Sequence, residues 1–220
     1  MTTLDSNPRF FDLVGDMRAM RRLKQDPVPQ ELLDRVLEAG VKAPSGMNTQ
    51  PWAFLVLREP EAKKWFADRY KAAIHSRFGD FEIPEGADSP GARQGRALHY
   101  QMDHMHEFPL LLIIAGLRDW PFRVPEDERK GLAPPNYGAV YPCVQNILLA
   151  CRAVGLGAAL TTMHQVFEEE LHERFGIPEE YGVVVTMPIG YPLGRFGPVR
   201  RKPAAGVTYY ESWGKTRSSP

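Results

Sequence analysis

The stretch Ala43–Trp52 joins two apolar segments through residues that are mostly polar or conformationally restricted. It follows residues 30–42, where apolar side chains recur at helical spacing, and it runs directly into the apolar run at 53–57. A plain connection needs only about 2–6 residues of turn chemistry. This stretch contains two prolines, a glycine and four hydroxyl or amide side chains. The composition fits an ordinary helix-to-strand loop, and it also fits a loop that presents backbone N–H groups to a ligand.

Apolar runs elsewhere in the chain predict a single sheet with helices between its strands. The expected strands lie near 53–57, 109–116, 157–160 and 183–190. We therefore predict an α+β or α/β sandwich with one mixed sheet, and a single domain over residues 1–220. With 220 residues, of which 43 % are hydrophobic, the chain can bury one good core.

Two parts of the chain are expected to lie outside that core. An excursion at about 61–107 contains two predicted helices, and residues 79–95 between them show little periodicity, so we predict a mobile connector or a lid there. The proline- and arginine-rich end from about 192 to 220 is predicted to be an extended arm. Residues 137–154 predict a helix so apolar that it runs through the middle of a domain or through a dimer interface.

The bulk composition excludes several kinds of partner. Lysine plus arginine equals aspartate plus glutamate at 27 each, so no global field attracts nucleic acid or an anionic membrane. The longest apolar run, residues 108–117, is shorter than the ~20 residues that span a bilayer. The first residues lack the apolar core of a secretory signal.

The two cysteines, Cys143 and Cys151, lie on one predicted helix, roughly 12 Å apart along its axis. That separation is too long for a disulfide, which needs Cα atoms within about 7 Å. Two unpaired thiols suit a reducing compartment, so we expect a cytoplasmic protein.

The histidines of the predicted helix at 96–107 raise the question of a metal site. His99 and Asp103 share a helix face, but His104 and His106 point elsewhere. No second cluster of ligands supports them, so we favour a solvated helix face and predict no metal, with a metal-dependent enzyme as the minor alternative. The chain also lacks Gly-x-Gly-x-x-Gly, Walker and Gly-x-Ser-x-Gly motifs.

The segment 18–24 contains four positive charges in seven residues. It could be a solvated basic turn, but arginines combined with backbone N–H groups also bind phosphate well. The alternatives stay open on charge alone.

Four separated pieces of sequence match one family in order and spacing. They are Arg18-Ala19-Met20-Arg21, the whole of Ala43–Trp52, Gly155-Leu156-Gly157 leading to Thr161-Thr162, and Gly190-Tyr191-Pro192 followed by Arg201-Lys202-Pro203. On these pieces the chain resembles the FMN-dependent nitroreductase-like flavoproteins, from about residue 9 to 213. The last piece looks particularly like the branch that contains the reductive iodotyrosine dehalogenases.

The resemblance implies a nitroreductase-like three-layer sandwich, in which helices flank a central mixed, mainly antiparallel sheet. It also implies a domain-interlocked homodimer with FMN at the interface. NAD(P)H would reduce the flavin, and a second substrate would then take the electrons in a ping-pong reaction through flavin N5. Such chemistry needs no nucleophile or general-acid pair, and the sequence offers none.

The resemblance also assigns roles to residues. Arg18 and Arg201 would bind the FMN phosphate, and Arg21 would lie near the N1/C2 carbonyl edge of the ring. Thr161 and Thr162 would lie near N5, each offering a backbone N–H or a hydroxyl, with Thr162 as the candidate that tunes the flavin. Ser45, Gly46 and Asn48 would come from the partner subunit. The complete set of cofactor-binding candidates is Arg18, Ala19, Met20, Arg21, Pro44, Ser45, Gly46, Asn48, Leu160, Thr161, Thr162 and Arg201.

Two departures from the family pattern bear on function. Ala19 stands where the family usually has serine, which removes one hydroxyl contact to FMN and weakens binding unless backbone groups compensate. The dehalogenases hold the amino-acid end of their substrate with a lid Glu and Tyr, and these positions fall near Ile74 and Phe78 here. With Met47, these two form the predicted substrate contacts.

An apolar lid argues against a zwitterionic substrate. We therefore expect an FMN-dependent NAD(P)H oxidoreductase that reduces a flat hydrophobic acceptor such as a nitroaromatic or a quinone. The alternatives are a reductive dehalogenase of an aromatic substrate and a flavin-binding module without turnover. The sequence does not choose between NADH and NADPH, since it contains no dedicated dinucleotide-binding motif.

Overall fold

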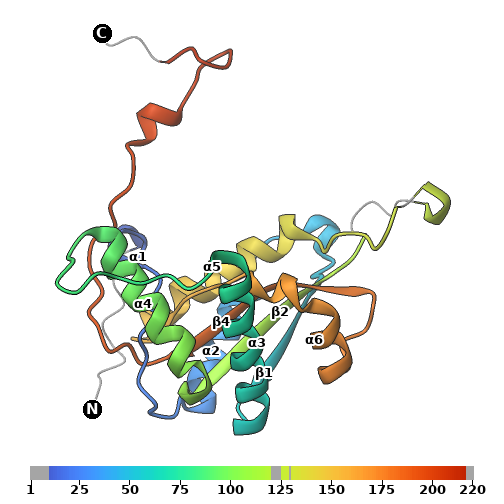
Figure 1. Ribbon diagram of the computed structural model, residues 1–220. Helices are drawn as coiled ribbons and strands as arrows, with labels where there is room; N and C mark the ends of the chain where they lie inside the picture. The colour runs from blue at the N-terminus through green and yellow to red at the C-terminus, as the bar shows by residue number, and fades with distance from the viewer. Residues whose placement is uncertain (1–9, 120–124, 129, 217–220) are drawn as a thin grey trace.

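Four antiparallel strands form the centre of the molecule (Figure 1). The computed structural model describes residues 10–119, 125–128 and 130–216. The strands are β1 (Trp52–Leu57), β2 (Leu110–Leu117), β3 (Gly157–Ala158) and β4 (Tyr181–Gly190), in the sheet order β1-β2-β4-β3. Each pairing between them is antiparallel. The predicted strands are confirmed, although the third ends two residues earlier than expected, and the described strands contain no parallel pair.

The sheet is covered by helices on both faces, which makes three layers. On β2, Leu110, Leu112 and Ile114 pack against α2 (Gln30–Gly40) and α5 (Tyr137–Ala153). Leu111 and Ile113 point the other way, into a second core with α3 (Pro60–Phe78) and α6 (Glu168–Phe175). Because side chains alternate across a strand, a strand buried on both faces is apolar at every position. The predicted α+β sandwich is confirmed.

The contact between α2 and α5 depends on a glycine. A Cβ atom at Gly40 would lie 2.7 Å from Cγ1 of Ile147, closer than a real Cβ approaches, so only glycine permits this spacing. Ile147, Cys143 and Cys151 are fully buried on the same helix. Both cysteines are free, as predicted, and burial raises the pKa of each thiol to about 12.

The excursion between β1 and β2 is more regular than the sequence predicted. Helix α4 (Pro90–His104) begins six residues before the predicted start, so the interpretation of 79–95 as a connector throughout is wrong. The reason is local: Ser89 caps the helix by accepting a hydrogen bond from the Ala92 N–H at 3.1 Å, and Pro90 suits the first helical position. The preceding loop is tied to α4 by Arg96, which donates to the Ala87 carbonyl at 2.6 Å.

One stripe of α5 is left uncovered by the rest of the chain. Tyr137 and Tyr141 are 41 % and 39 % exposed, and Gln145 continues the exposed stripe one turn later. The two phenylalanines of α1 (Phe10–Asp16) are also exposed. A single chain therefore does not bury α5 on nearly every side, and of the two predicted settings for this helix the interface is the one that the exposed stripe favours.

The chain ends in an arm that leaves the body, seen at the top of Figure 1. The arm runs from residue 192 through the short helix η5 (Ala204–Val207). Beyond the helix, Trp213 is 90 % exposed. No helix within the described ranges is long and apolar enough to cross a membrane.

Candidate functional site

The basic segment after α1 lies along one edge of the sheet. The Met20 N–H donates to the Ala158 carbonyl of β3 at 2.9 Å, and the Lys24 N–H donates to the Tyr191 carbonyl at 2.8 Å. Met20 is buried against Gly157, where a Cβ atom would lie 2.8 Å from the Met20 Cβ. These contacts hold Arg18, Ala19 and Arg21 beside β3 and beside the turn that follows it.

The turn after β3 is fixed to β4 by its first threonine. The Thr161 N–H donates to the Thr186 carbonyl at 2.8 Å, and the Thr186 N–H returns a bond to the Thr161 carbonyl at 3.0 Å. Thr161 Oγ1 accepts from the Met163 N–H at 3.3 Å. The Thr161 N–H is therefore not available to a ligand.

Thr162 is the residue of this turn that remains free to donate. Its carbonyl accepts from the Gln165 N–H at 3.1 Å, while neither its N–H nor its hydroxyl bonds to another described residue. The side chain is exposed, and so is that of Leu160. Of the two threonines predicted near N5, the geometry leaves Thr162 as the possible donor.

Tyr70 on α3 belongs to this region, and sequence reasoning missed it. The side chain is 2 % exposed, and burial raises the pKa of its phenol to about 12. A hydrogen bond to the Thr161 side chain and the positive charge of Arg21 act in the opposite direction on the same pKa. One hydroxyl thus lies within the influence of both segments that were predicted to contact the flavin ring. In the sequence, Tyr70 showed only the aromatic spacing of ordinary helix packing.

The predicted phosphate ligands lie at one end of the molecule. The Val199 N–H donates to the Gly15 carbonyl at 3.0 Å, which fixes the start of the arm beside the end of α1. Arg152 of α5 strengthens this junction, because it bonds both carboxylate oxygens of Asp16 at 2.9 and 2.7 Å. Its guanidinium also lies 4.4 Å from the ring centroid of Phe196.

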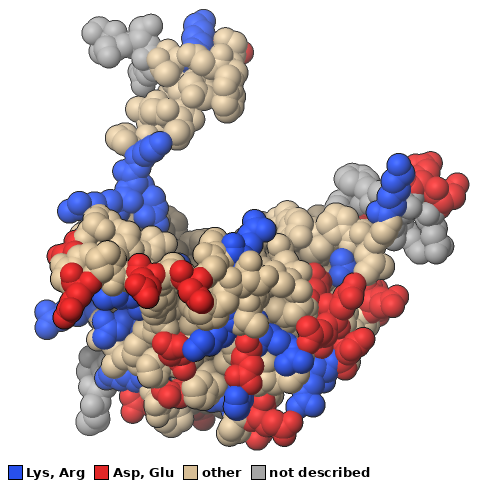
Figure 2. Space-filling model, in the orientation of Figure 1, with Lys and Arg blue, Asp and Glu red and all other residues tan. Residues whose placement is uncertain are grey.

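Positive charge accumulates at this end without being neutralised. Figure 2 shows lysine and arginine side chains gathered where the arm leaves the body. The sequence of the arm includes the basic run Arg200-Arg201-Lys202. Within the described ranges, Arg18, Arg21 and Arg201 make no ion pair with a carboxylate, whereas Arg69, Arg118, Arg152 and Arg174 all do. Unpaired arginines near backbone donors are suited to bind a phosphate.

The opening loop, residues 43–52, has an unusual backbone. Met47, Asn48 and Gln50 have backbone φ values of 49°, 56° and 49°, which residues other than glycine seldom adopt. Ser45 supports the loop by accepting a hydrogen bond from the Gln50 N–H at 3.0 Å. Pro44, Gly46, Met47 and Asn48 are exposed. Strained and exposed backbone of this kind is typical of ligand-binding loops.

One chain does not bring this loop to the basic segment. The loop precedes β1 at one edge of the sheet, while Thr161 pairs with β4 at the other edge. Three strand spacings separate the two edges, roughly 14 Å. Within the chain, the structure joins residues 18–21, 160–162 and the start of the arm, and it leaves residues 44–48 apart.

The three predicted substrate residues differ in their exposure. Met47 is 79 % exposed and Phe78 is 60 % exposed. Ile74 is 1 % exposed and packs in the core with Phe66 and Tyr70, so in the single chain it is not at the surface with the other two. On α3, Ile74 follows Tyr70 by four residues, so both side chains face the sheet.

The polar side chains of the histidine-rich helix α4 form ordinary side-chain pairs. Asp103 accepts from Lys71 at 2.7 Å, and His104 lies 2.9 Å from Glu107. Residues 10–119, 125–128 and 130–216 contain no group of three or more His, Cys, Asp or Glu that could hold a metal ion.

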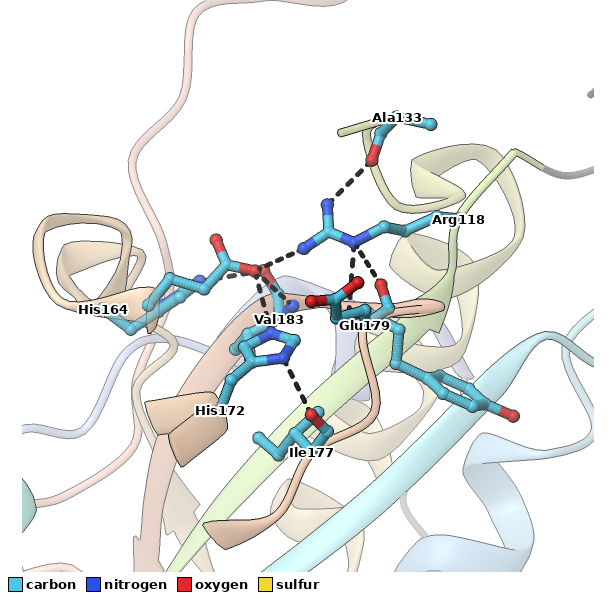
Figure 3. A network of polar contacts seen from close by, with 9 residues as sticks. Arg118, Ala133, His164, His172, Ile177, Glu179 and Val183 are labelled. Carbon is cyan, nitrogen blue, oxygen red and sulfur yellow. Dashed lines mark hydrogen bonds and ion pairs between the residues drawn. The ribbon is translucent and has the colours of Figure 1, made fainter. Parts of the chain in front are cut away.

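A separate polar network lies around the end of β2 (Figure 3). Arg118 donates to Glu168 at 3.1 Å and to the carbonyls of Ala133 and Glu179 at 2.7 and 3.0 Å. A cavity of about 770 Å³ beside it is lined by five glutamates, so it does not suit a phosphate. The cavity residues are Arg118, Leu132, Gln165, Val166, Phe167, Glu168, Glu169, Glu170, His172, Glu173 and Glu179.

The comparison with known proteins places the chain in a family. The model of the Nitroreductase family matches residues 16–191, which is most of the chain, so this protein belongs to the nitroreductase family. The resemblance read from the four sequence pieces is thereby confirmed.

Relatives and solved structures extend over nearly the same length. An NADH dehydrogenase of Thermus thermophilus is 25 % identical over 205 residues, covering 88 % of this chain and 91 % of the relative. An iodotyrosine deiodinase of Thermotoga neapolitana is 25 % identical over 186 residues, covering 83 % and 88 %. A crystal structure of iodotyrosine deiodinase bound to FMN and 3-iodo-L-tyrosine has a TM-score of 0.67 at 24 % identity, covering 88 % and 95 %. That likeness shows the fold.

The Asp16–Arg152 pair yields a pH-dependent prediction. The hydrogen bond from Arg152 lowers the pKa of Asp16, so the pair stabilises the fold when the carboxylate is ionised. We expect Asp16→Asn to reduce the free energy of unfolding at pH 7 by about 1–2 kcal/mol. The difference from wild type should be full above about pH 5 and should vanish progressively as pH falls below about 4, through the lowered pKa.

Urea unfolding at a series of pH values measures this difference. Asp68→Asn is the matched control, because Asp68 pairs with Lys64 on an exposed helix face, and its effect should stay within about 0.5 kcal/mol. Equal effects of the two variants, or an Asp16→Asn effect that does not depend on pH, would contradict the role given to the pair.

Proposed function

We propose that this protein is an FMN-dependent oxidoreductase that takes electrons from NAD(P)H and passes them to a flat hydrophobic acceptor. The observation that carries the proposal is that Arg18, Arg21 and Arg201 make no ion pair with a carboxylate of the described residues, while Thr162 keeps a free donor, in a nitroreductase fold. Solved structures with this fold include nitroreductases with bound FMN from Desulfitobacterium hafniense and Desulfovibrio desulfuricans.

The residues at this edge of the sheet fit the cofactor. Arg18 and Arg201 can bind the phosphate, because both are exposed and neither is neutralised by a carboxylate among the described residues. Arg21 is half-buried near the hydroxyl of Tyr70, where its charge can stabilise negative charge on a ring edge. Thr162 can donate to a ring nitrogen.

When bound, FMN supplies the hydride chemistry at N5, so the protein needs to hold the ring, place charge and a donor at its edge, and leave one face open. The missing hydroxyl at Ala19 removes one possible contact. The backbone of the same segment is engaged with β3 through Met20, which keeps its position without that hydroxyl.

The second wall of the site is proposed to come from another copy of the chain. Ser45, Gly46 and Asn48 lie at the opposite sheet edge in their own chain, so they can complete the pocket only across a homodimer interface. The uncovered stripe of α5 and the exposed phenylalanines of α1 support such an interface, because large obligate interfaces are apolar. The C-terminal arm is proposed to interlock the two subunits.

The acceptor is proposed to be a nitroaromatic or a quinone. The two exposed side chains that were predicted to contact it, Met47 and Phe78, are apolar and carry no charge for a zwitterion. The α3–α4 excursion is the proposed lid. Free buried thiols at positions 143 and 151 support a reducing cytoplasm as the compartment.

The assignment of Arg18 and Arg201 to the phosphate makes a prediction about cofactor retention. We expect the double variant Arg18→Ala/Arg201→Ala to bind FMN at least about 100-fold more weakly, because it loses two charge-assisted contacts of roughly 1.5–3 kcal/mol each. Arg174→Ala is the control, since Arg174 pairs with Glu61 on another surface, and it should retain FMN like wild type. Flavin content measured after desalting distinguishes them.

Unchanged flavin content in the double variant would refute the phosphate assignment. A wild-type protein that stays colourless after incubation with FMN would refute the proposed function itself.

The proposed acceptor class makes a prediction about substrate preference. With FMN bound and either NADH or NADPH as reductant, we expect kcat/KM for nitroaromatics and quinones to exceed that for halotyrosines at least about tenfold. Tenfold is the discrimination expected when a charged amino-acid end finds no partner. A preference for halogenated phenols would instead favour a reductive dehalogenase, an activity in keeping with the relatives named iodotyrosine deiodinase. Bound flavin that neither nucleotide reduces would favour a binding module without turnover.

A further inference from the structure

His164 ends the turn that presents Thr162, and it is the most deeply buried polar residue near the proposed site. The side chain is 0 % exposed. Its Nε2 lies 2.9 Å from the carbonyl oxygen of Val183 on β4 (Figure 3). The turn is therefore attached to β4 at two points, by the backbone pair of Thr161 with Thr186 and by the ring of His164.

The hydrogen bond to Val183 defines which nitrogen of the His164 ring carries a proton. A carbonyl oxygen can only accept, so Nε2 must carry the proton. Burial lowers the pKa of His164, so the ring is neutral around pH 7. The imidazole thus acts as a fixed donor rather than as a titrating acid or base.

The carbonyl that His164 holds is itself fixed. The Val183 N–H donates to Glu168 Oε1 at 2.9 Å, and Glu168 is paired with Arg118 at 3.1 Å. Arg118 lies against Gly182, where a Cβ atom would come within 2.8 Å of its Cζ. The network of Figure 3 therefore fixes the strand segment whose carbonyl accepts from His164.

Burial of the His164 ring costs free energy, because its Nδ1 has no hydrogen-bond partner among the described residues. We therefore ask what the bond from Nε2 to Val183 does for the turn. Within the turn, the carbonyl of Thr162 accepts from Gln165, and the carbonyl of His164 accepts from the Phe167 N–H at 2.9 Å. If the ring bond were lost, the hydrogen bonds that tie η4 (Met163–Val166) to its surroundings would be these local bonds, the bond from the Met163 N–H to Thr161 and the Thr161 pair with β4. Thr162, which lies between the two attachment points, would then move relative to β3.

We propose that His164 is a positioning residue that holds the Thr162 donor at the edge of the bound flavin. The proposal rests on the proposed function. His164 itself touches neither cofactor nor substrate, and it acts through the main chain of the turn. A donor held within a few tenths of an ångström of its place is what a site built by pre-organised dipoles requires.

The test compares three variants of purified, FMN-loaded protein. His164→Met removes the donor at similar volume, and His164→Gln keeps an N–H donor that can reach Val183. His172→Met is the control for the network itself. His172 on α6 has its Nδ1 2.9 Å from the Ile177 carbonyl oxygen and its Nε2 3.6 Å from Glu168 Oε1, so this change disturbs the network of Figure 3 while the bond from His164 to Val183 stays in place. The first measurement is the anaerobic rate constant for reduction of bound flavin by NAD(P)H.

We expect His164→Met to lower that rate constant about tenfold, the factor that corresponds to one lost buried hydrogen bond. His164→Gln should recover to within about threefold of wild type, and His172→Met should match wild type. A purely structural role would instead give equal effects for the two methionine variants, and this result would overturn the proposal.

The second measurement needs no cofactor. In flavin-free protein, hydrogen exchange at the Gln165 amide should be about tenfold faster in His164→Met than in wild type, and unchanged in His172→Met. If His164→Met does not fold, His164→Asn replaces it, because its shorter amide does not reach Val183. Wild-type exchange and wild-type flavin reduction in the His164 variants would refute the positioning role and leave the proposed function intact. Failure of wild type to take up FMN would instead refute the proposed function.

Discussion

The antiparallel pairing of β2 with β4 is the constraint on which the rest of the structure depends. Both strands are apolar on both faces, so each face must be covered by helices and neither strand can lie at an edge. The short β3 and the half-buried β1 are left as the two edges. Every polar segment of the proposed site attaches to one of these edges. The width of the sheet therefore separates the loop at 44–48 from the turn at 160–162, and it makes a site from two chains the simplest arrangement.

The arginines of the molecule fall into a paired group and an unpaired group. Arg118 and Arg152 are partly buried and fully committed, each to a carboxylate and to the structure around it. Arg18 and Arg21 flank Met20, which bonds to β3, and Arg201 lies on the arm, and none of the three has such a partner among the described residues. An uncompensated cluster destabilises the free protein slightly through repulsion, and an anion that binds there relieves it. The arrangement explains why the basic end and the acidic cavity beside Arg118 can coexist on a protein of zero formal net charge.

The sequence predicted what depends on local pattern. The apolar runs located the strands, the stripe with Leu33 and Val36 located α2, and Cys143 and Cys151 are free as their helical spacing required. It also grouped the basic segment with the turn after β3, although only through resemblance to a family.

The misses depend on contacts between distant parts of the chain. Whether Tyr70 only packs in the core or also lies near Thr161 depends on how α3 packs against the turn after β3, which is far away in the sequence. The bond from His164 to Val183 is invisible for the same reason. The burial of Ile74 is of the same kind, because the place of a residue along a helix does not tell which helix face meets the sheet. The early start of α4 is different, because Ser89-Pro90 is a local signal that was available and was not used.

The most direct test of a site shared between chains is complementation of two defective variants. Arg21→Ala damages the wall from one chain, and Asn48→Gly removes the amide from the other wall while glycine keeps the left-handed backbone. Each variant alone should lose most NAD(P)H-dependent turnover. When the two are co-expressed, half of the dimers are mixed and each mixed dimer contains one intact site, so about a quarter of wild-type turnover should return. Turnover that stays at the level of the separate variants would contradict the account, because it would place the whole site within one chain.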